Sequence, residues 1–354
     1  MAAVLSPIEH STSSSKFLDR HDHLGHDETL FQQQSIASKS IDGVESSSEW
    51  SIPKSDWTPL CHPRVEEVSR EVDGYFLEHW KFPNAKAERV FVNAGFSRVT
   101  CLYFPLSKDD RIHFACRLLT LLFLIDDILE EMSFDDGKVY NDNLIPIARG
   151  DVLPDRNVPV ERITYDLWES MRACDKELAD EVLEPTFTFM RAQTDKVRMS
   201  ITELGHYLEY REKDVGKALL SSLMRFSMKL NLTPQELARV KPLEQNCSKQ
   251  ISVVNDIYSW EKEVRAAETG HKEGSFLCSA VKVFSVSTSL DIPATRRVLW
   301  HMTREWERVH DQLVAEVEAE GCRDAVKQYM KGLEYQMSGN ELWSKTTLRY
   351  SVVE

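Results

Sequence analysis

Apolar residues recur every three or four positions along most of the chain from about Trp57 onward. This spacing puts apolar side chains on one face of an α-helix and predicts helical segments over residues 110–132, 162–180, 233–239 and 294–320. Prolines separate these stretches, and Thr233-Pro234-Gln235-Glu236 has the order of a helix start: a cap, a proline and a glutamate. Alternating β-type runs are nearly absent. We therefore predict one all-α domain of about ten helices over residues 57–354.

The segment from Leu118 to Ile125 is apolar on every side. A helix of this kind lies in the middle of a bundle, and it is far shorter than the roughly 20 residues that cross a bilayer. The segment ends in Asp126-Asp127-Ile128-Leu129-Glu130-Glu131. Carboxylates that a buried helix delivers to one place need a cation nearby.

Residues 1–56 have a different composition, with 13 serines and few apolar residues at regular spacing. Such a segment cannot bury enough surface to offset its ordering entropy, so we predict a disordered, serine-rich N-terminal tail. Its histidines lack acidic or thiol partners in register, so no metal site is expected there. Residues 1–15 show no basic region followed by an apolar core, and no secretory signal is expected.

The charge and the cysteines narrow the function classes. The chain has 57 acidic and 43 basic residues, a formal charge of −14, so we expect no nucleic-acid partner. Its seven cysteines are scattered, odd in number and form no C-x-x-C pair, which argues against a disulfide framework or a structural zinc site. The expectation is a cytoplasmic protein with no membrane span.

Two clusters of oxygen-bearing side chains have the spacing of metal ligands. Asp126 and Glu130 are four residues apart, so they share one helix face, and carboxylates held this close favour a hard divalent cation. The alternative is a solvated acidic helix end. The nearby Asp135-Asp136-Gly137 predicts a turn rather than a ligand set.

The second cluster is Asn255, Ser259 and Glu263, which follow an i, i+4, i+8 pattern. On a helix they form one ladder of an amide, a hydroxyl and a carboxylate, an all-oxygen set that suits Mg²⁺ shared with a phosphate. Asparagine and serine are poor helix-interior residues, so their presence here indicates a function. The alternative is ordinary helix polarity.

Together the two clusters resemble the aspartate-rich and Asn-Ser-Glu motifs of class I terpene cyclases. Longer stretches, such as residues 96–105 and 332–341, resemble the fungal sesquiterpene cyclases of that class, and the resemblance covers essentially all of 57–354. It implies a single helical bundle around an apolar cavity, three Mg²⁺ ions, and a homodimer or higher homo-oligomer. The first motif ends in Glu130 rather than aspartate, which leaves its direct contact with metal open, while Asp127 is expected to support rather than ligate.

The resemblance also implies the residues that bind a diphosphate. Arg211 corresponds to the family's diphosphate sensor, and Asp214 links it to a helix break. Lys262, Arg349 and Tyr350 correspond to the other donors. Arginine suits this task because its planar fork binds two oxygens at once. A basic residue of this kind, considered alone, is more often part of a surface ion pair.

An apolar cavity needs aromatic walls, because carbocations are quenched by water and stabilised by aromatic faces. Phe123 lies one turn before Asp126 and should point into the cavity beneath the metals. Tyr103, Phe189 and Trp343 match the other pocket aromatics by resemblance. An aromatic residue of this kind, considered alone, more often belongs to plain core packing.

The resemblance implies a Mg²⁺-dependent lyase whose substrate is farnesyl diphosphate. Ionisation, closure to germacrene A, reprotonation and a second closure would lead to aristolochene, with release of diphosphate. The alternatives are a related synthase that releases germacrene A or another eremophilane, a chain-elongating prenyltransferase, and a non-catalytic helical scaffold.

Overall fold

The computed structural model describes residues 50–350, so the predicted tail over 1–56 lies almost wholly outside the described residues. The described chain is helical and contains no strand, which confirms the predicted all-α class. Its elements are α1 Val65–His79, α2 Ala85–Ala94, α3 Phe96–Tyr103, α4 Ile112–Leu129, α5 Phe134–Arg149, α6 Pro159–Cys174, α7 Lys176–Gln193, η1 Lys196–Ser200, α8 Leu204–Asp214, α9 Lys217–Met228, α10 Pro234–Thr269, α11 Ala280–Thr288, α12 Ile292–Ala319, α13 Asp324–Thr346 and η2 Leu348–Tyr350.

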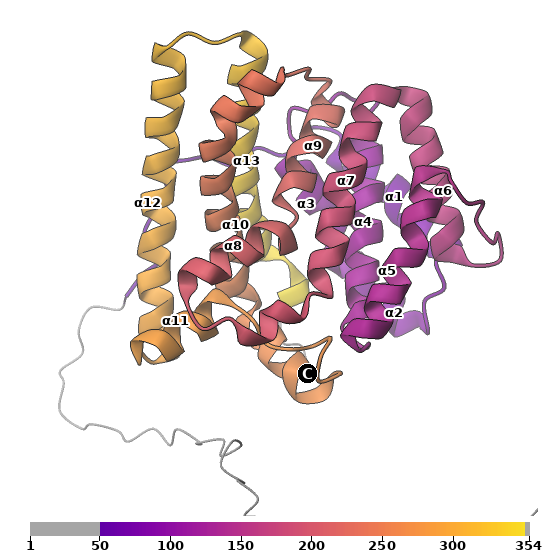
Figure 1. The fold of residues 1–354 in the computed structure, drawn as a ribbon, viewed down its shortest axis with the longest axis horizontal. Helices are drawn as coiled ribbons and strands as arrows, with labels where there is room; N and C mark the ends of the chain where they lie inside the picture. The colour runs from indigo at the N-terminus through magenta and orange to yellow at the C-terminus, as the bar shows by residue number, and fades with distance from the viewer. Residues whose placement is uncertain (1–49, 351–354) are drawn as a thin grey trace, which may run out of the picture. The chain divides into compact units, whose positions relative to one another are not determined.

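The helices form a bundle in which α10, α12 and α13 lie on one side and α4 to α7 on the other (Figure 1). Helix α10 packs on α12 and α13, and α9 bridges to α4 and α7. Helix α4 runs through the apolar core: from Leu118 to Ile125 every residue except Phe123 is buried. This confirms that the all-apolar helix is central. The half-buried Phe123 packs against this core and also lines a cavity.

The predicted start of α10 is confirmed. The side chain of Thr233 accepts a hydrogen bond from the backbone of Glu236, whose carboxylate accepts one from the backbone of Thr233, and Pro234 fills the first helical position. The sequence pattern predicted a helix over residues 233–239 and helical spacing at Asn255–Glu263, and the structure joins both in one helix of 36 residues that ends at Thr269. Pro242 lies inside it at the ninth position, past the first turn, where a proline removes one internal hydrogen bond.

Three details of the sequence prediction are wrong. The segment 162–180 is divided at Asp175, whose side chain caps α7 by accepting from the backbone of Leu178. Pro146 and Pro185 lie within α5 and α7 and do not separate helices. Asp135 and Asp136 belong to the first turn of α5, where acidic residues favour the helix dipole, and they do not form a free turn.

The segment before α1 is attached to α12. The guanidinium of Arg304 donates to the carbonyl of Pro53 over 2.8 Å, and the hydroxyl of Ser55 donates to Glu307 over 2.8 Å. Residues 51–56, which the sequence analysis placed in the tail, therefore include contacts with the helical body. No helix in the described range 50–350 is long and apolar enough to cross a membrane.

Candidate active site

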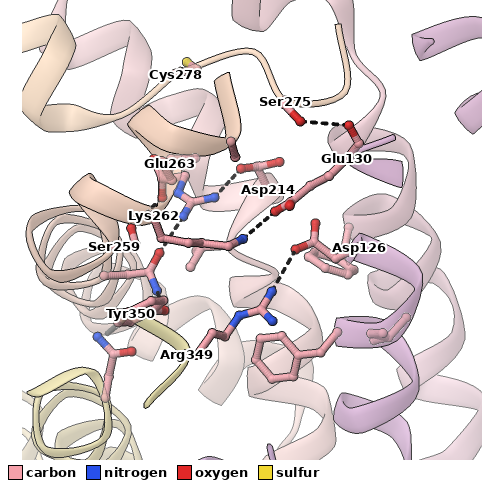
Figure 2. A pocket seen from close by; sticks show the side chains of 18 of the residues that line it. Asp126, Glu130, Asp214, Ser259, Lys262, Glu263, Ser275, Cys278, Arg349 and Tyr350 are labelled. Carbon is pink, nitrogen blue, oxygen red and sulfur yellow. Dashed lines mark hydrogen bonds and ion pairs between the residues drawn. The ribbon is translucent and has the colours of Figure 1, made fainter. Parts of the chain in front are cut away.

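A cavity of about 220 Å³ lies between α4 and α10. All thirteen residues that the sequence analysis selected line it: Tyr103, Phe123, Asp126, Glu130, Phe189, Arg211, Asn255, Ser259, Lys262, Glu263, Trp343, Arg349 and Tyr350. They come from α3, α4, α7, α8, α10, α13 and η2, so segments separated by more than a hundred residues meet here. Figure 2 shows the charged residues facing one another across its mouth.

The C-terminal end of α4 supplies one side of the mouth. Carboxylate oxygens of Asp126, Asp127 and Glu130 lie within 4.8 Å of one another. Desolvation in the cavity and the charge of Glu130 raise the pKa of Asp126 to about 6. A cation nearby would stabilise the ionised form of this carboxylate, because opposite charge offsets the burial and the repulsion from Glu130.

Helix α10 supplies the opposite side with Asn255, Ser259 and Glu263. The hydroxyl of Ser259 donates to the carboxylate of Glu263, and the amide of Asn255 donates to the phenol oxygen of Tyr350 over 2.6 Å. Burial and the charge of Asp256 raise the pKa of Glu263 to about 7. The three oxygens occupy successive turns of one helix face, as the i, i+4, i+8 spacing predicted.

These two sets fit a divalent cation that prefers oxygen ligands. Neither contains a thiol or an imidazole, and the pKa values of Asp126 and Glu263 are raised because burial and neighbouring negative charge disfavour the ionised forms. The residues able to hold a metal are Asp126, Glu130, Asn255, Ser259 and Glu263, with Asp127 beside them.

The basic residues of the mouth are paired with acidic or amide groups (Figure 2). Lys262 contacts Glu130 over 2.6 Å, and Arg349 contacts Asp127 over 2.7 Å. Arg211 donates to Asn255 over 2.9 Å and also pairs with Asp214. Burial alone would lower the pKa of Arg349, but the charges of Asp127 and Asp126 and the hydrogen bond to Asp127 together outweigh burial and raise the pKa above its ordinary value.

Aromatic side chains form the deeper wall. Phe123 stacks on Phe96 with ring centroids 4.4 Å apart, and Trp343 lies 6.1 Å from Phe123 and 5.3 Å from Tyr350. The indole of Trp343 donates to the carbonyl of Ala94 over 3.2 Å, which fixes the ring against the cavity. Trp343 therefore lines the cavity from a fixed position.

Tyr103 and Phe189 complete the wall. The hydroxyl of Tyr103 donates to Asn340 over 2.8 Å, so this ring has a satisfied polar end. Phe189 lies at the break between α8 and α9, where Gly216 adopts φ +70°. A methyl group on Gly216 would approach the Phe189 ring to 3.1 Å, so glycine serves both the left-handed turn and the close approach.

The sequence analysis missed the loop between α10 and α11, residues 270–279, called here the mouth loop. Ser275 and Cys278 of this loop line the cavity, and the hydroxyl of Ser275 donates to the carbonyl of Glu130 over 2.8 Å (Figure 2). No periodicity marks the loop. Its two glycines, Gly270 and Gly274, are the available sequence signal for a close approach of backbone to another element.

Two buried polar residues beside the site were also missed. Gln193 donates to Asp126 over 2.8 Å. Asp256 accepts from Tyr207 and from the backbone of Ala280, and it lies 3.4 Å from Arg211, so it fixes the guanidinium and the start of α11 together. The position of Asp256 within the Asn255–Glu263 segment was visible in the sequence, whereas the partner of Gln193 was not.

Comparison with known proteins identifies the family. The family model described as terpene synthase family 2, C-terminal metal binding, matches residues 117–309. The chain belongs to the terpene synthase family. The match spans the acidic end of α4 and the Asn255–Glu263 ladder, so a divalent metal site in this terpene synthase is supported by the family and by the geometry of the acidic cluster together.

Individual relatives are similar over most of their length. The aristolochene synthase of Penicillium roqueforti is 72% identical over 301 residues, which cover 84% of this chain and 88% of that protein. The aristolochene synthase of Aspergillus terreus is 64% identical over 309 residues, covering 87% and 97%. A crystal structure of the Penicillium roqueforti enzyme superposes with a TM-score of 0.76 at 68% identity, covering 84% of this chain and all of that one.

Proposed function

We propose that this terpene synthase is a Mg²⁺-dependent sesquiterpene cyclase that converts farnesyl diphosphate to aristolochene and releases diphosphate. The observation that carries the proposal is one cavity with two chemically different halves. Carboxylates and cations crowd its mouth, while aromatic and aliphatic side chains line its depth. A substrate with a charged head and an apolar chain matches this division, and relatives that carry the name aristolochene synthase support the choice of product.

The residues at the mouth bind and orient the diphosphate. Arg211, Lys262 and Arg349 converge on it as donors, and Tyr350 adds a hydroxyl. Three Mg²⁺ ions held by Asp126, Glu130, Asn255, Ser259 and Glu263 would supply Lewis-acid stabilisation of the leaving group. Preorganised cations of this kind act most strongly where charge develops as the carbon–oxygen bond breaks.

The deeper wall folds the isoprenoid chain and protects the cation. Faces of Phe123, Phe189 and Trp343 can stabilise positive charge by about 2 kcal/mol each when water is absent. No histidine is among the described residues that line the cavity. The released diphosphate, held by the mouth residues, is therefore the group best placed to return and remove protons.

One incubation tests the proposal. The full chain with farnesyl diphosphate and Mg²⁺ should yield aristolochene, identified by gas chromatography with mass spectrometry. Mainly germacrene A or another eremophilane would correct the product. A longer diphosphate, formed in a second incubation that also contains isopentenyl diphosphate, would indicate a prenyltransferase. No reaction in either incubation would indicate a scaffold.

A matched pair of variants on α10 tests the metal ligands. Glu263→Gln should reduce turnover by orders of magnitude, because it removes a carboxylate from the ladder. Glu261→Gln changes a carboxylate that instead bonds Arg296 over 2.8 Å, outside the cavity, so turnover should persist. Normal turnover in a folded Glu263→Gln protein would contradict the assignment.

A further inference from the structure

Gln193 is the last residue of α7 and lies beside the acidic end of α4. Its Nε2 donates a hydrogen bond of 2.8 Å to Oδ1 of Asp126. The residue is 7% exposed, and its Oε1 has no hydrogen-bond partner within the described residues. A buried polar atom without a partner costs stability, so this amide needs an explanation.

The end of α7 is held in place from two sides. The carbonyl of Gln193 accepts a hydrogen bond from Arg198 over 3.3 Å, and Arg198 also reaches the carbonyl of Phe276 in the mouth loop over 3.4 Å. Three residues before Gln193, the carbonyl of Met190 accepts from the buried amide of Asn141 over 2.8 Å. The Gln193 amide therefore meets Asp126 from an anchored backbone and not from a free helix end.

We propose that Gln193 is a positioning residue that orients Asp126 for a divalent cation. The inference rests on the proposed function, because it needs a metal at the acidic end of α4. With Oδ1 held by the amide, Oδ2, which lies 3.9 Å from Arg349, is the oxygen left for the cation. The unpaired Oε1 of Gln193 is an acceptor that a cation-bound water would satisfy. Partners of this kind orient metal ligands and tune their affinity.

The test compares binding, not turnover. Mg²⁺ is titrated into the full chain at fixed inorganic diphosphate, and the response is followed by calorimetry and by the shift in melting temperature. Gln193→Met keeps the length of the side chain and removes the donor. We expect its Mg²⁺ midpoint to rise roughly 10- to 100-fold.

Asn141→Leu is the matched control. It removes another buried amide that bonds α7, also with an unpaired oxygen, but this amide has no contact with the acidic cluster. The control should lower the melting temperature and shift the Mg²⁺ midpoint far less than Gln193→Met does, because the Gln193 amide itself is still present. Gln193→Asn, with the donor withdrawn by one methylene, should shift the midpoint in the same direction as Gln193→Met and is measured if the Met variant does not fold.

Each outcome separates the two proposals. A Gln193 variant whose midpoint stays within about threefold of the wild type would overturn the positioning role alone, since partners of this kind change affinity by more. An equal shift in Asn141→Leu would also overturn it, because the effect would then come from loosening α7. A wild-type chain with no response to Mg²⁺ and diphosphate would overturn the proposed function itself.

Discussion

The closest backbone approach at the cavity mouth makes Gly274→Ala a sharp test of how the site is assembled. Gly274 lies in the mouth loop against the last carbonyls of α4. A methyl group at this position would come within 2.3 Å of the carbonyl oxygen of Leu129, 2.6 Å of that of Met132 and 2.7 Å of that of Glu130. All three atoms are backbone, so no side-chain rotation can relieve the clash.

The size of the effect follows from these distances. Ordinary contact begins near 3.4 Å, so the loop and the end of α4 must separate by roughly 1 Å. The separation would weaken the bond from Ser275 to Glu130 and move Asp126 relative to α10. Overpacking of this kind costs about 1–3 kcal/mol, and a 1 Å misplacement of reacting groups costs about 100-fold in rate.

Steady-state kinetics and thermal unfolding of two alanine variants provide the assay. Gly74→Ala is the control, because its added methyl group meets no atom within 4 Å and it lies in α1, where alanine favours the helix. We expect kcat/KM to fall about 100-fold in Gly274→Ala and to stay unchanged in Gly74→Ala. Wild-type kcat/KM in Gly274→Ala would refute the idea that the loop is fitted to the acidic helix.

Three further predictions follow from the structure. The Trp343→Val variant should still consume farnesyl diphosphate but release mainly monocyclic hydrocarbon, because losing about 1.4 kcal/mol of cation stabilisation changes the partitioning between monocyclic and bicyclic products tenfold. The Trp343→Phe variant should keep a larger bicyclic share. Gas chromatography at equal conversion measures the ratio of the two products, and an unchanged ratio in both variants would remove Trp343 from the site. A protein that starts at Trp50 keeps the described contacts with α12 and should match the full chain in melting temperature and turnover, so a large loss would show that residues 1–49 contribute. Burial lowers the pKa of His310 to about 4 from 6.5, so on acidification the unfolded chain takes up a proton first, and the free energy of unfolding falls by about 3 kcal/mol as the pH drops from 6.5 to 4. Denaturant titrations should show that the free energy of unfolding of His310→Phe falls less steeply over this pH range. An identical dependence on pH in the variant and the wild type would contradict this.

The parts of the fold that the sequence predicted are those with strong local signals. The uniformly apolar run of α4 and the capping box of α10 each determine an element without help from distant residues. The ligand spacing on α10 is local as well, since three residues four apart share a face on any helix. Both clusters lie on helices that the sequence predicts locally. The prediction that the two clusters line one cavity came from the family resemblance.

The parts that the sequence did not predict depend on tertiary contacts. Pro185 remains inside α7 because packing outweighs its local cost, and the helix break at Asp175 depends on a side-chain cap that periodicity does not reveal. Gln193 and Asp126 are 67 residues apart, and nothing in either neighbourhood indicates their hydrogen bond. The same holds for Gly274, whose close approach to α4 appears only when the mouth loop is in place.

The ion pairs at the mouth have a consequence for the order of binding. Lys262 is paired with Glu130, and Arg349 with Asp127, so anions proposed near the metal already hold cations proposed for the diphosphate. A metal ion that binds alone would take the carboxylates from Lys262 and Arg349 and leave these basic side chains unpaired. Diphosphate that binds alone would take the basic side chains and leave Glu130 and Asp127 unpaired. When the metal and the diphosphate bind together, the carboxylates pair with the metal and the basic side chains pair with the diphosphate, so no charged group is left unpaired. The resting protein should therefore bind metal and diphosphate with mutual cooperativity, which protects an empty cavity from occupation by either ion alone.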